Sequence, residues 1–584
     1  MSTIFSTTFT PTLHQLVEQF GNTQYQGQLI EAWVFANQEH RQQAESALLN
    51  LGIKAKFRSA YKPLLHFFLE EMDVISSKVT RIEVHYPIDE SASEKRFLLE
   101  TYPLSALVGK ANIHFVANPE ATDFYDVILR AETGVQTQHK VFAPNHLHLD
   151  FINQAHLSPT GWLKITDSEG KLTENQRLIT DYEALFNAAM TAISKHTWSE
   201  NEPYFEELNI QVSLPWKDQP LPYRHEVISL CEALHEDFYF SLQEWFKTKA
   251  GYLPNERTSQ PGQIVPEIGY SKADNLSITI ATRAYQTENT TGQQSLESAE
   301  APISMAQVEE ELAKITGDIF TADTITSRKV NARYHKGTDF PVMISGGQHA
   351  NETTGVVGAL RAAQILNQQK DSHFTISPLE NPDGYALHQR LIKDNPQHMH
   401  HAARYTGLGD DLEYREKGSL YEKEIRHKAR EMSQAQLHIN LHGYPSHEWT
   451  RPLSGYVPHG FDMWTIPKGF FLILRHSADE KWTTYAEEFA HLVTLKLIKI
   501  PGVLAFNNEQ VELYRKHAGE TNFRIINSFP CLISHGESED IPIQLITEYP
   551  DETIYGEHFI TGHDVQTATV LAAYEVHQLL SANH

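Results

Sequence analysis

Hydrophobic and polar positions alternate with two different periods along the first half of the chain. Short stretches repeat every second residue or are rich in β-branched and aromatic side chains, which predicts strands. Longer stretches repeat with helical spacing, and the last of them ends at a glycine, a common helix stop. The predicted strands are 29–36, 53–57, 81–86, 113–117 and 124–132, and the predicted helices are 38–51, 181–196 and 225–251.

Helix and strand patterns also alternate in the second half, but here the strands are nearly continuous in their apolar character. Such runs are typical of strands that are buried on both faces of a mainly parallel sheet flanked by helices. The second half therefore predicts an α/β fold with a mixed, mainly parallel sheet. The helices are expected at 304–316 and 354–366, and the strands at 341–345, 437–441 and 541–549.

A chain of 584 residues is longer than one hydrophobic core usually organises. Residues 286–302 are polar, carry Gly and Ser and lack periodicity, so they are the best linker in the sequence. We expect three parts: an α/β to β-rich region at 1–175, a helical segment with the linker at 176–300, and the α/β unit at 301–584.

The net charge of −26 argues against nucleic acid and anionic membranes as partners, because both need clustered Lys and Arg. Only Cys231 and Cys531 occur, which supports neither a disulfide framework nor a thiolate zinc site. The N-terminus lacks a basic region followed by an apolar one, and no stretch of 18 apolar residues occurs. We expect a cytoplasmic, soluble protein whose oligomeric state the sequence does not indicate.

The strand at 341–345 leads into two glycines and then into His349-x-x-Glu352. Spacing alone is weak, because about two such pairs are expected by chance among 32 histidines, and a second one occurs at His517 and Glu520. The second pair lies in a polar, charged stretch. The first follows a strand end, where open α/β sheets carry their sites, and residues i and i+3 can reach one ion. His349 and Glu352 are therefore candidate metal ligands.

A catalytic zinc site needs a third protein ligand and an open position for water. In the strand 437–442, His438, Asn440 and His442 point to one side, and His442 is the last of them. His442 is the predicted third ligand, and His438 is the alternative. Glu548 ends another strand and could act as the base for a metal-activated water, although a Glu at a strand end is more often simply solvated.

Two other groups of histidines could also belong to a site. His146 and His148 share a strand face with Asp150, for which an exposed face is the expected reading rather than a second metal site. The histidines of 395–405 are expected in a loop near the pocket, solvated rather than in contact with substrate.

The order of four segments resembles the funnelin-type zinc metallocarboxypeptidases. The four are "GGQHANE" (346–352), "ENPDGY" (380–385), "INLHGY" (439–444) and "ITEYPDETIYG" (546–556). The resemblance covers roughly 304–584 and says nothing about the first 300 residues. It implies that His349, Glu352 and His442 bind one Zn²⁺ per chain and that Glu548 is the general base.

The family also uses arginines to stabilise the oxyanion and to hold a terminal carboxylate, a task that suits the guanidinium group. The family's Asn-Arg pair appears here as Tyr414-Arg415, so Arg415 fits the carboxylate role without its Asn partner. For the oxyanion, Arg404 is preferred over Arg390. Tyr514 is the nearest equivalent of the substrate-capping tyrosine.

Three functions are open on this reading. The first is a zinc carboxypeptidase that acts on peptides, which "NPDGY" favours. The second is a zinc deacylase of N-acyl amino acids, a related branch that shares the Asn of "GGQHANE". The third is a catalytically silent binding module, against which the retained ligands and Glu548 count.

Overall fold

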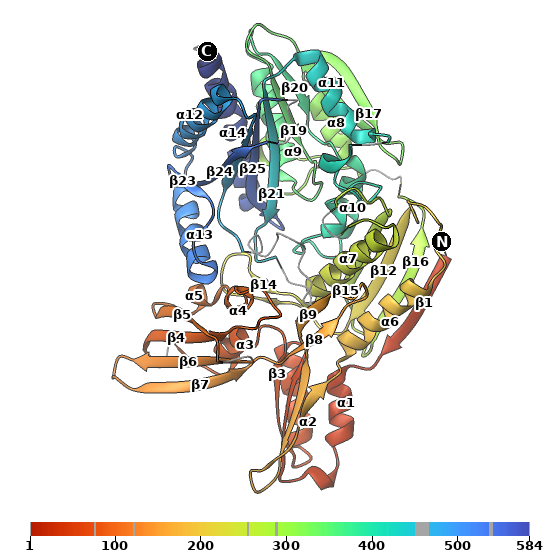
Figure 1. Ribbon diagram of the computed structural model, residues 1–584, viewed down its shortest axis with the longest axis vertical. Helices are drawn as coiled ribbons and strands as arrows, with labels where there is room; N and C mark the ends of the chain where they lie inside the picture. The colour runs from red at the N-terminus through yellow and green to blue at the C-terminus, as the bar shows by residue number, and fades with distance from the viewer. Residues whose placement is uncertain are drawn as a thin grey trace.

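The computed structural model describes residues 2–74, 77–120, 123–253, 256–286, 290–416, 418–449, 466–536 and 541–582. A nine-stranded sheet with helices on its faces makes up the C-terminal half of the chain. Among the described residues, three four-stranded and two two-stranded sheets form the N-terminal half, below it in Figure 1. No helix in the described ranges is long and apolar enough to cross a membrane.

The nine strands lie in the order β17-β18-β20-β19-β21-β25-β22-β24-β23. The central strands β20, β19, β21 and β25 are parallel, as are β22 and β24, and the other neighbours are antiparallel. The predicted mixed α/β fold is confirmed, with parallel pairing concentrated at the centre. The bounds are β17 (Asp318–Asp323), β18 (Lys329–His335), β19 (Val342–Gly346), β20 (Phe374–Ser377), β21 (Leu437–Pro445), β22 (Phe471–His476), β23 (Arg524–Ile526), β24 (Phe529–His535) and β25 (Ile543–Glu552).

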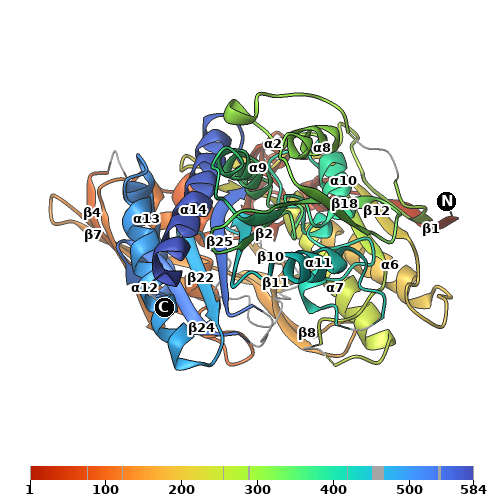
Figure 2. The same ribbon diagram turned by 90° about the horizontal axis from the view of Figure 1, so that it is seen from above.

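The helix α9 (Thr354–Leu366) coincides with its prediction because its apolar positions face the core. Val356, Leu360 and Ala363 are fully buried there. A Cβ at Gly358 would come within 2.5 Å of Gln566, so this glycine allows α9 and α14 to lie side by side (Figure 2). The other helices of this half are α8 (Met305–Ala313), α10 (Pro382–Leu391), α11 (Glu424–Ser433), α12 (Glu480–Leu497), α13 (Val503–Ala518) and α14 (Glu557–Ser581).

The N-terminal half contains the sheets β11-β10-β2-β3, β5-β4-β6-β7 and β1-β16-β12-β15. The strands are β1 (Ser2–Phe9), β2 (Leu29–Val34), β3 (Lys54–Ser59), β4 (Val79–Pro87), β5 (Asn112–Asn118), β6 (Phe124–Ala131), β7 (Gln136–Phe142), β8 (Asn145–Leu149), β9 (Ala155–Pro159), β10 (Gly161–Thr166), β11 (Leu172–Leu178), β12 (Glu207–Leu214), β13 (Gln219–Pro220), β14 (Val227–Ile228), β15 (Gln263–Tyr270) and β16 (Leu276–Arg283). The helices are α1 (Thr12–Phe20), α2 (Gln38–Leu49), α3 (Pro63–Glu70), α4 (Arg96–Leu99), α5 (Leu104–Leu107), α6 (Asp181–Lys195) and α7 (Leu230–Lys249).

Strand pairing connects the two parts expected on either side of residue 175, because β1 pairs with β16. In the expected linker, residues 287–289 lie outside the described residues, while Leu296 and Ala299 are buried in the core of the C-terminal half. The division at 175 and 300 remains a prediction.

The two halves share a hydrophobic core. Phe238 and Phe240 of α7 belong to the same buried cluster as Leu387 of α10, Ala402 and Trp449. Apolar surface removed from water at such a contact stabilises the arrangement of both halves together. The N-terminal half is therefore packed onto the segment that follows α10.

Glu70 forms a buried ion pair that should make the N-terminal half acid-sensitive. Burial alone would raise the pKa of Glu70, but hydrogen bonds from His66 and Arg41 outweigh burial and lower the pKa from 4.5 to about 2. Because the folded-state pKa is depressed, the stabilisation is present above pH 4.5 and is lost as the pH falls toward 2. We expect Glu70→Gln to reduce the free energy of unfolding by about 3 kcal/mol at pH 7, and by progressively less below pH 4.5.

Urea unfolding of wild type and Glu70→Gln between pH 3 and pH 7 measures this difference. Glu71→Gln is the matched control, because Glu71 pairs with the partly exposed Arg58 and such pairs contribute about 1 kcal/mol or less. An equal difference between wild type and Glu70→Gln at pH 3 and pH 7 would contradict the assignment.

Candidate metal centre and catalytic pocket

The turn between β19 and α9 presents His349 and Glu352 at the C-terminal edge of the parallel strands. Gly347 has φ +62°, and a Cβ there would come within 2.7 Å of Leu379, so the turn requires glycine. The backbone N–H of Glu352 donates to the carbonyl of His349 at 3.2 Å. Because α9 begins at Thr354, this turn, rather than the helix, brings the two side chains together.

The three predicted metal ligands form one buried group. Glu352 Oε1 lies 2.9 Å from His349 Nδ1, and Glu352 Oε2 lies 2.9 Å from His442 Nδ1. The two Nδ1 atoms are 3.0 Å apart. Among the described residues, His349, Glu352 and His442 form the one group of three or more His, Cys, Asp or Glu side chains whose donor atoms lie close enough together to bind one metal ion. His438 instead contacts Ser345 Oγ at 2.7 Å, so His442 is the histidine that joins the group.

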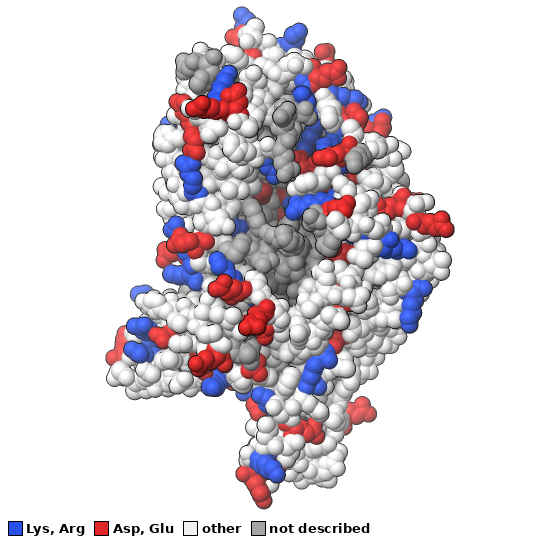
Figure 3. Space-filling model, viewed as in Figure 1, with Lys and Arg blue, Asp and Glu red and all other residues white. Residues whose placement is uncertain are grey.

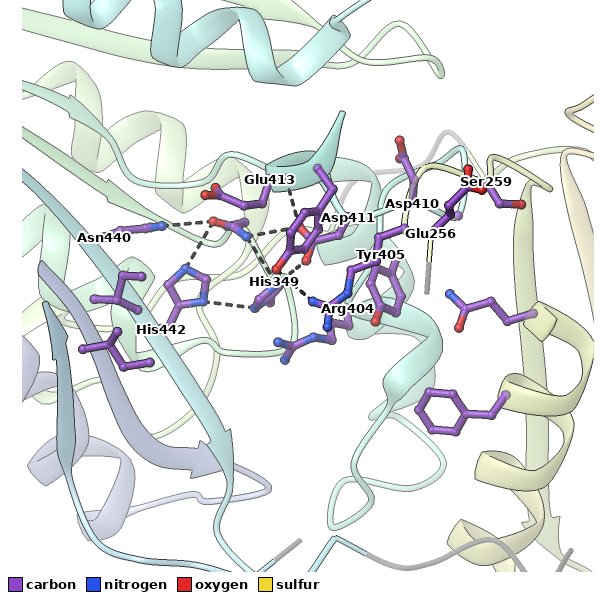
Figure 4. A pocket seen from close by; sticks show the side chains of 18 of the residues that line it. Glu256, Ser259, His349, Arg404, Tyr405, Asp410, Asp411, Glu413, Asn440 and His442 are labelled. Atoms are coloured by element: carbon purple, nitrogen blue, oxygen red, sulfur yellow. Dashed lines mark hydrogen bonds and ion pairs between the residues drawn. The ribbon is translucent and has the colours of Figure 1, made fainter. Parts of the chain in front are cut away.

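Polar neighbours fix the outer nitrogens of both rings, as Figure 4 shows. His349 Nε2 lies 3.1 Å from Asp411 Oδ2, and His442 Nε2 lies 3.2 Å from Gln348 Oε1. Gln348 also donates to Asp411 Oδ1 at 3.1 Å. An acceptor at the outer nitrogen places the proton there and leaves Nδ1 free to bind a cation.

The electrostatics of the group keep Glu352 ionised. Burial would raise the pKa of Glu352, but the charges of His349, Arg404 and His442 hold it well below its usual value. Burial and Arg404 lower the pKa of His349, and the charges of Glu352 and Asp411 more than compensate. An ionised carboxylate next to two imidazole nitrogens is a suitable donor set for a divalent cation.

Glu548 lies beside this group on the neighbouring strand. In the parallel pairing of β21 and β25, Glu548 is the register partner of His442. Burial raises the pKa of Glu548 well above its usual value, and the charge of Glu352 adds to this effect. Lys468 and Arg404 oppose it.

One pocket contains His349, His442, Glu548 and Arg404, and its volume is about 250 Å³. Arg404 follows the short turn His401–Ala403, and its Nη1 lies 2.6 Å from Glu352 Oε1. The space-filling view shows this face of the molecule hollowed near its centre (Figure 3). Arg404, the predicted oxyanion arginine, and Glu548, the predicted base, therefore line the same pocket.

Three residues predicted to bind substrate lie elsewhere. Arg390 pairs with Glu207 at 3.0 Å, on the contact with the N-terminal half. Arg415 is buried and pairs with Asp410 and with Glu422. Neither lines the pocket.

Tyr514 is also absent from the pocket lining. It is buried in a small core with Leu99, Tyr102 and Ile466. Burial raises the pKa of Tyr514 to about 12. The expected substrate roles of Arg390, Arg415 and Tyr514 gain no support from these positions.

The pocket has a wall that sequence reasoning missed. Helix α7 and the segment after it supply side chains opposite the sheet. No local motif marks them, because they reach the pocket only through packing between the two halves. The wall residues are Phe240, Gln243, Glu244, Lys247, Glu256, Arg257 and Ser259.

The other histidines that the sequence singled out lie outside the donor group. His400 and His401 were expected in a solvated loop, but both are buried, because α7 covers that loop; the ring of His401 lies 4.6 Å from the ring of Phe240. The second His-x-x-Glu pair is no donor group either. His517 is buried against Thr101 and Ser105, whereas Glu520 is exposed.

His146 and His148 lie on the hairpin of β8 and β9, with their rings stacked 4.8 Å apart. They were expected on an exposed face, but both are partly buried because they line a separate cavity with Phe35 and Phe186. They do not form a metal-donor group with any other described residue.

No protein-family model matches the sequence, and no curated protein matches it. Among solved structures, a metallo-carboxypeptidase from Burkholderia cenocepacia is similar over 53% of this chain and 73% of its own, with 11% identity and a TM-score of 0.30. A structure of bovine thrombin-activatable fibrinolysis inhibitor with tick carboxypeptidase inhibitor covers 47% and 95%, with 10% identity and a TM-score of 0.27. A succinylglutamate desuccinylase/aspartoacylase from Rhodobacter sphaeroides covers 44% and 65%, with 12% identity and a TM-score of 0.27.

Proposed function

We propose that the protein is a zinc-dependent hydrolase that cleaves an amide bond, and that it acts as a carboxypeptidase. One observation carries the proposal. The two histidines of a buried His-Glu-His donor group line the same pocket as a carboxylate, Glu548, that is not itself one of the three donors. Three protein ligands that open onto a pocket are the signature of a catalytic zinc site rather than a structural one.

The residues present fit zinc well. Two imidazole nitrogens and one ionised carboxylate converge, and Asp411 and Gln348 orient the rings from outside. Bound zinc would supply a Lewis acid for the scissile carbonyl and would lower the pKa of a coordinated water.

The side chains of the protein would carry out the proton transfers and position the charges. Glu548 would accept the proton of the attacking water and pass it to the leaving nitrogen, as a general base and then a general acid. Arg404 would donate hydrogen bonds to the oxyanion that develops on the carbonyl oxygen. Asp411 would accept a hydrogen bond from Nε2 of His349. This keeps the tautomer in which Nδ1 carries no proton and can bind the metal.

A deacylase of N-acyl amino acids is the second candidate. A pocket of about 250 Å³ suits a small substrate, and neither Arg415 nor Tyr514 lines it. An acylated amino acid would use the same ligands, base and arginine as a short peptide. The silent binding module remains the alternative in which the protein binds such molecules without turnover.

The test is release of free amino acids from two substrate series by the full-length protein. The first series is benzoyl-Gly-X dipeptides, and the second is N-acetyl and N-succinyl amino acids. We expect release from the peptide series, abolished by phenanthroline and restored by added Zn²⁺. Release from the acyl series alone would favour the deacylase, and one bound zinc without release from either series would favour the binding module.

A further inference from the structure

The floor of the pocket is built from three strands whose side chains form successive rows. His442 of β21, Glu548 of β25 and Phe471 of β22 are register partners and define the catalytic row. Two residues along each strand, Asn440, Ile546 and Ile473 form the next row. Side chains two residues apart lie on the same face of a strand, so the rows form one continuous floor.

The third row ends in a cation. Arg475 and Gln544 are register partners, and both line the pocket that contains Glu548. Arg475 lies four residues beyond Phe471 on β22, a separation of about 13 Å along the strand. The pocket therefore leads from the catalytic row, past two isoleucines, to a guanidinium and an amide.

Arg475 can be reached by a ligand in the pocket. Its side chain is 37% exposed, and its ion pair with Glu413 is long, at 3.5 Å. Glu413 makes its closer ion pair with Arg426. A substrate carboxylate can therefore take the place of Glu413 at Arg475, and Glu413 still keeps its ion pair with Arg426.

The other cations of the pocket have closer partners. Arg404 contacts Glu352 at 2.6 Å, and Lys247 contacts Glu244 at 2.7 Å. Arg257, on the opposite wall, donates to the hydroxyl of Tyr414 at 2.8 Å and stacks on the same ring.

We infer that Arg475 is a specificity-determining residue that binds the side-chain carboxylate of an acidic leaving residue. The substrates would then be short peptides or N-acyl amino acids that end in glutamate or aspartate. The inference rests on the proposed function, because it takes Glu548 and His442 to mark the scissile bond. The distance favours the side-chain carboxylate, since the α-carboxylate of the same residue lies nearer to that bond.

The first test compares kcat/KM for benzoyl-Gly-Glu and benzoyl-Gly-Gln, which differ in charge and hardly in shape. Wild type should prefer the glutamate substrate by about 10- to 100-fold, the usual range for a charged hydrogen-bonded pair. Arg475→Gln should bring the ratio close to one, and Arg475→Glu should shift the preference toward benzoyl-Gly-Lys. Arg257→Gln, a pocket arginine on the opposite wall, should keep the wild-type ratio.

A binding measurement tests the same point without turnover. Zinc-loaded Glu548→Gln should bind benzoyl-Gly-Glu about 10- to 100-fold more tightly than benzoyl-Gly-Gln by calorimetry, and the double variant with Arg475→Gln should lose this difference. Binding discrimination by the Glu548→Gln variant, together with no hydrolysis of either probe by wild type, would sink the proposed function and keep the role of Arg475.

Three results would overturn the role of Arg475. In the first, wild type has the same kcat/KM for benzoyl-Gly-Glu and benzoyl-Gly-Gln. In the second, the preference for benzoyl-Gly-Glu survives in Arg475→Gln. In the third, wild type discriminates only between benzoyl-Gly-Gln and its C-terminal amide. The third would mean that the pocket recognises the α-carboxylate instead.

Discussion

Glu548→Gln is expected to lower kcat by about 10²- to 10⁴-fold, the usual contribution of a positioned general base. An amide at this position keeps the shape of the side chain but cannot accept the proton of the attacking water. Glu548 is the register partner of His442 but is not one of the three proposed zinc ligands. The zinc content of the variant should therefore stay near one per chain. The measurement is steady-state hydrolysis together with elemental analysis of the same samples.

The matched control is Glu488→Gln, a change of the same kind on the exposed face of α12. It should leave both kcat and zinc content at wild-type values. If Glu548→Gln retained more than a tenth of wild-type kcat, Glu548 would not be the general base.

The second large effect is loss of the metal from His349→Ala and from His442→Ala. Each substitution removes one of three donors and leaves Glu352 with one imidazole neighbour, too few ligands for a stable zinc site. We expect wild type to carry about one zinc per chain after dialysis and both variants to carry almost none. Elemental analysis measures the content, and circular dichroism checks that the variants are folded.

His517→Ala is the control for this experiment, because His517 begins the other His-x-x-Glu pair and is buried in a contact with Thr101, outside the donor group and the pocket lining. It should retain its zinc even if it is less stable than wild type. Full zinc retention in both His349→Ala and His442→Ala would contradict the metal site and, with it, the hydrolase.

Local patterns explain what the sequence predicted well. Helix α9 was predicted residue for residue because its buried face repeats with helical spacing within 13 residues. His349 and Glu352 could be singled out as candidates because they lie three residues apart after a recognisable strand and glycine turn, and the structure brings their side chains together. His442 followed from the alternation of one strand, in which the last inward histidine reaches the sheet edge.

Contacts that depend on the folded arrangement of the chain explain what the sequence did not predict. Arg415 follows a plausible motif position, but Asp410 and Glu422 hold it inside its own loop, which no spacing rule indicates. Asp411 lies next to that motif, yet only the fold shows that it faces His349. Arg475 reaches the pocket through the strand register of β22 and β25, which the sequence alone does not fix.

The shared core of the two halves makes the N-terminal half part of the proposed active site. Phe238 and Phe240 pack against the segment that leads into Arg404, and Lys247 and Arg257 line the same pocket as Glu548. The C-terminal half therefore does not form the whole pocket by itself. Substitutions at these buried contacts in the first 300 residues should therefore also reduce activity, although they lie far from the proposed zinc ligands in the sequence.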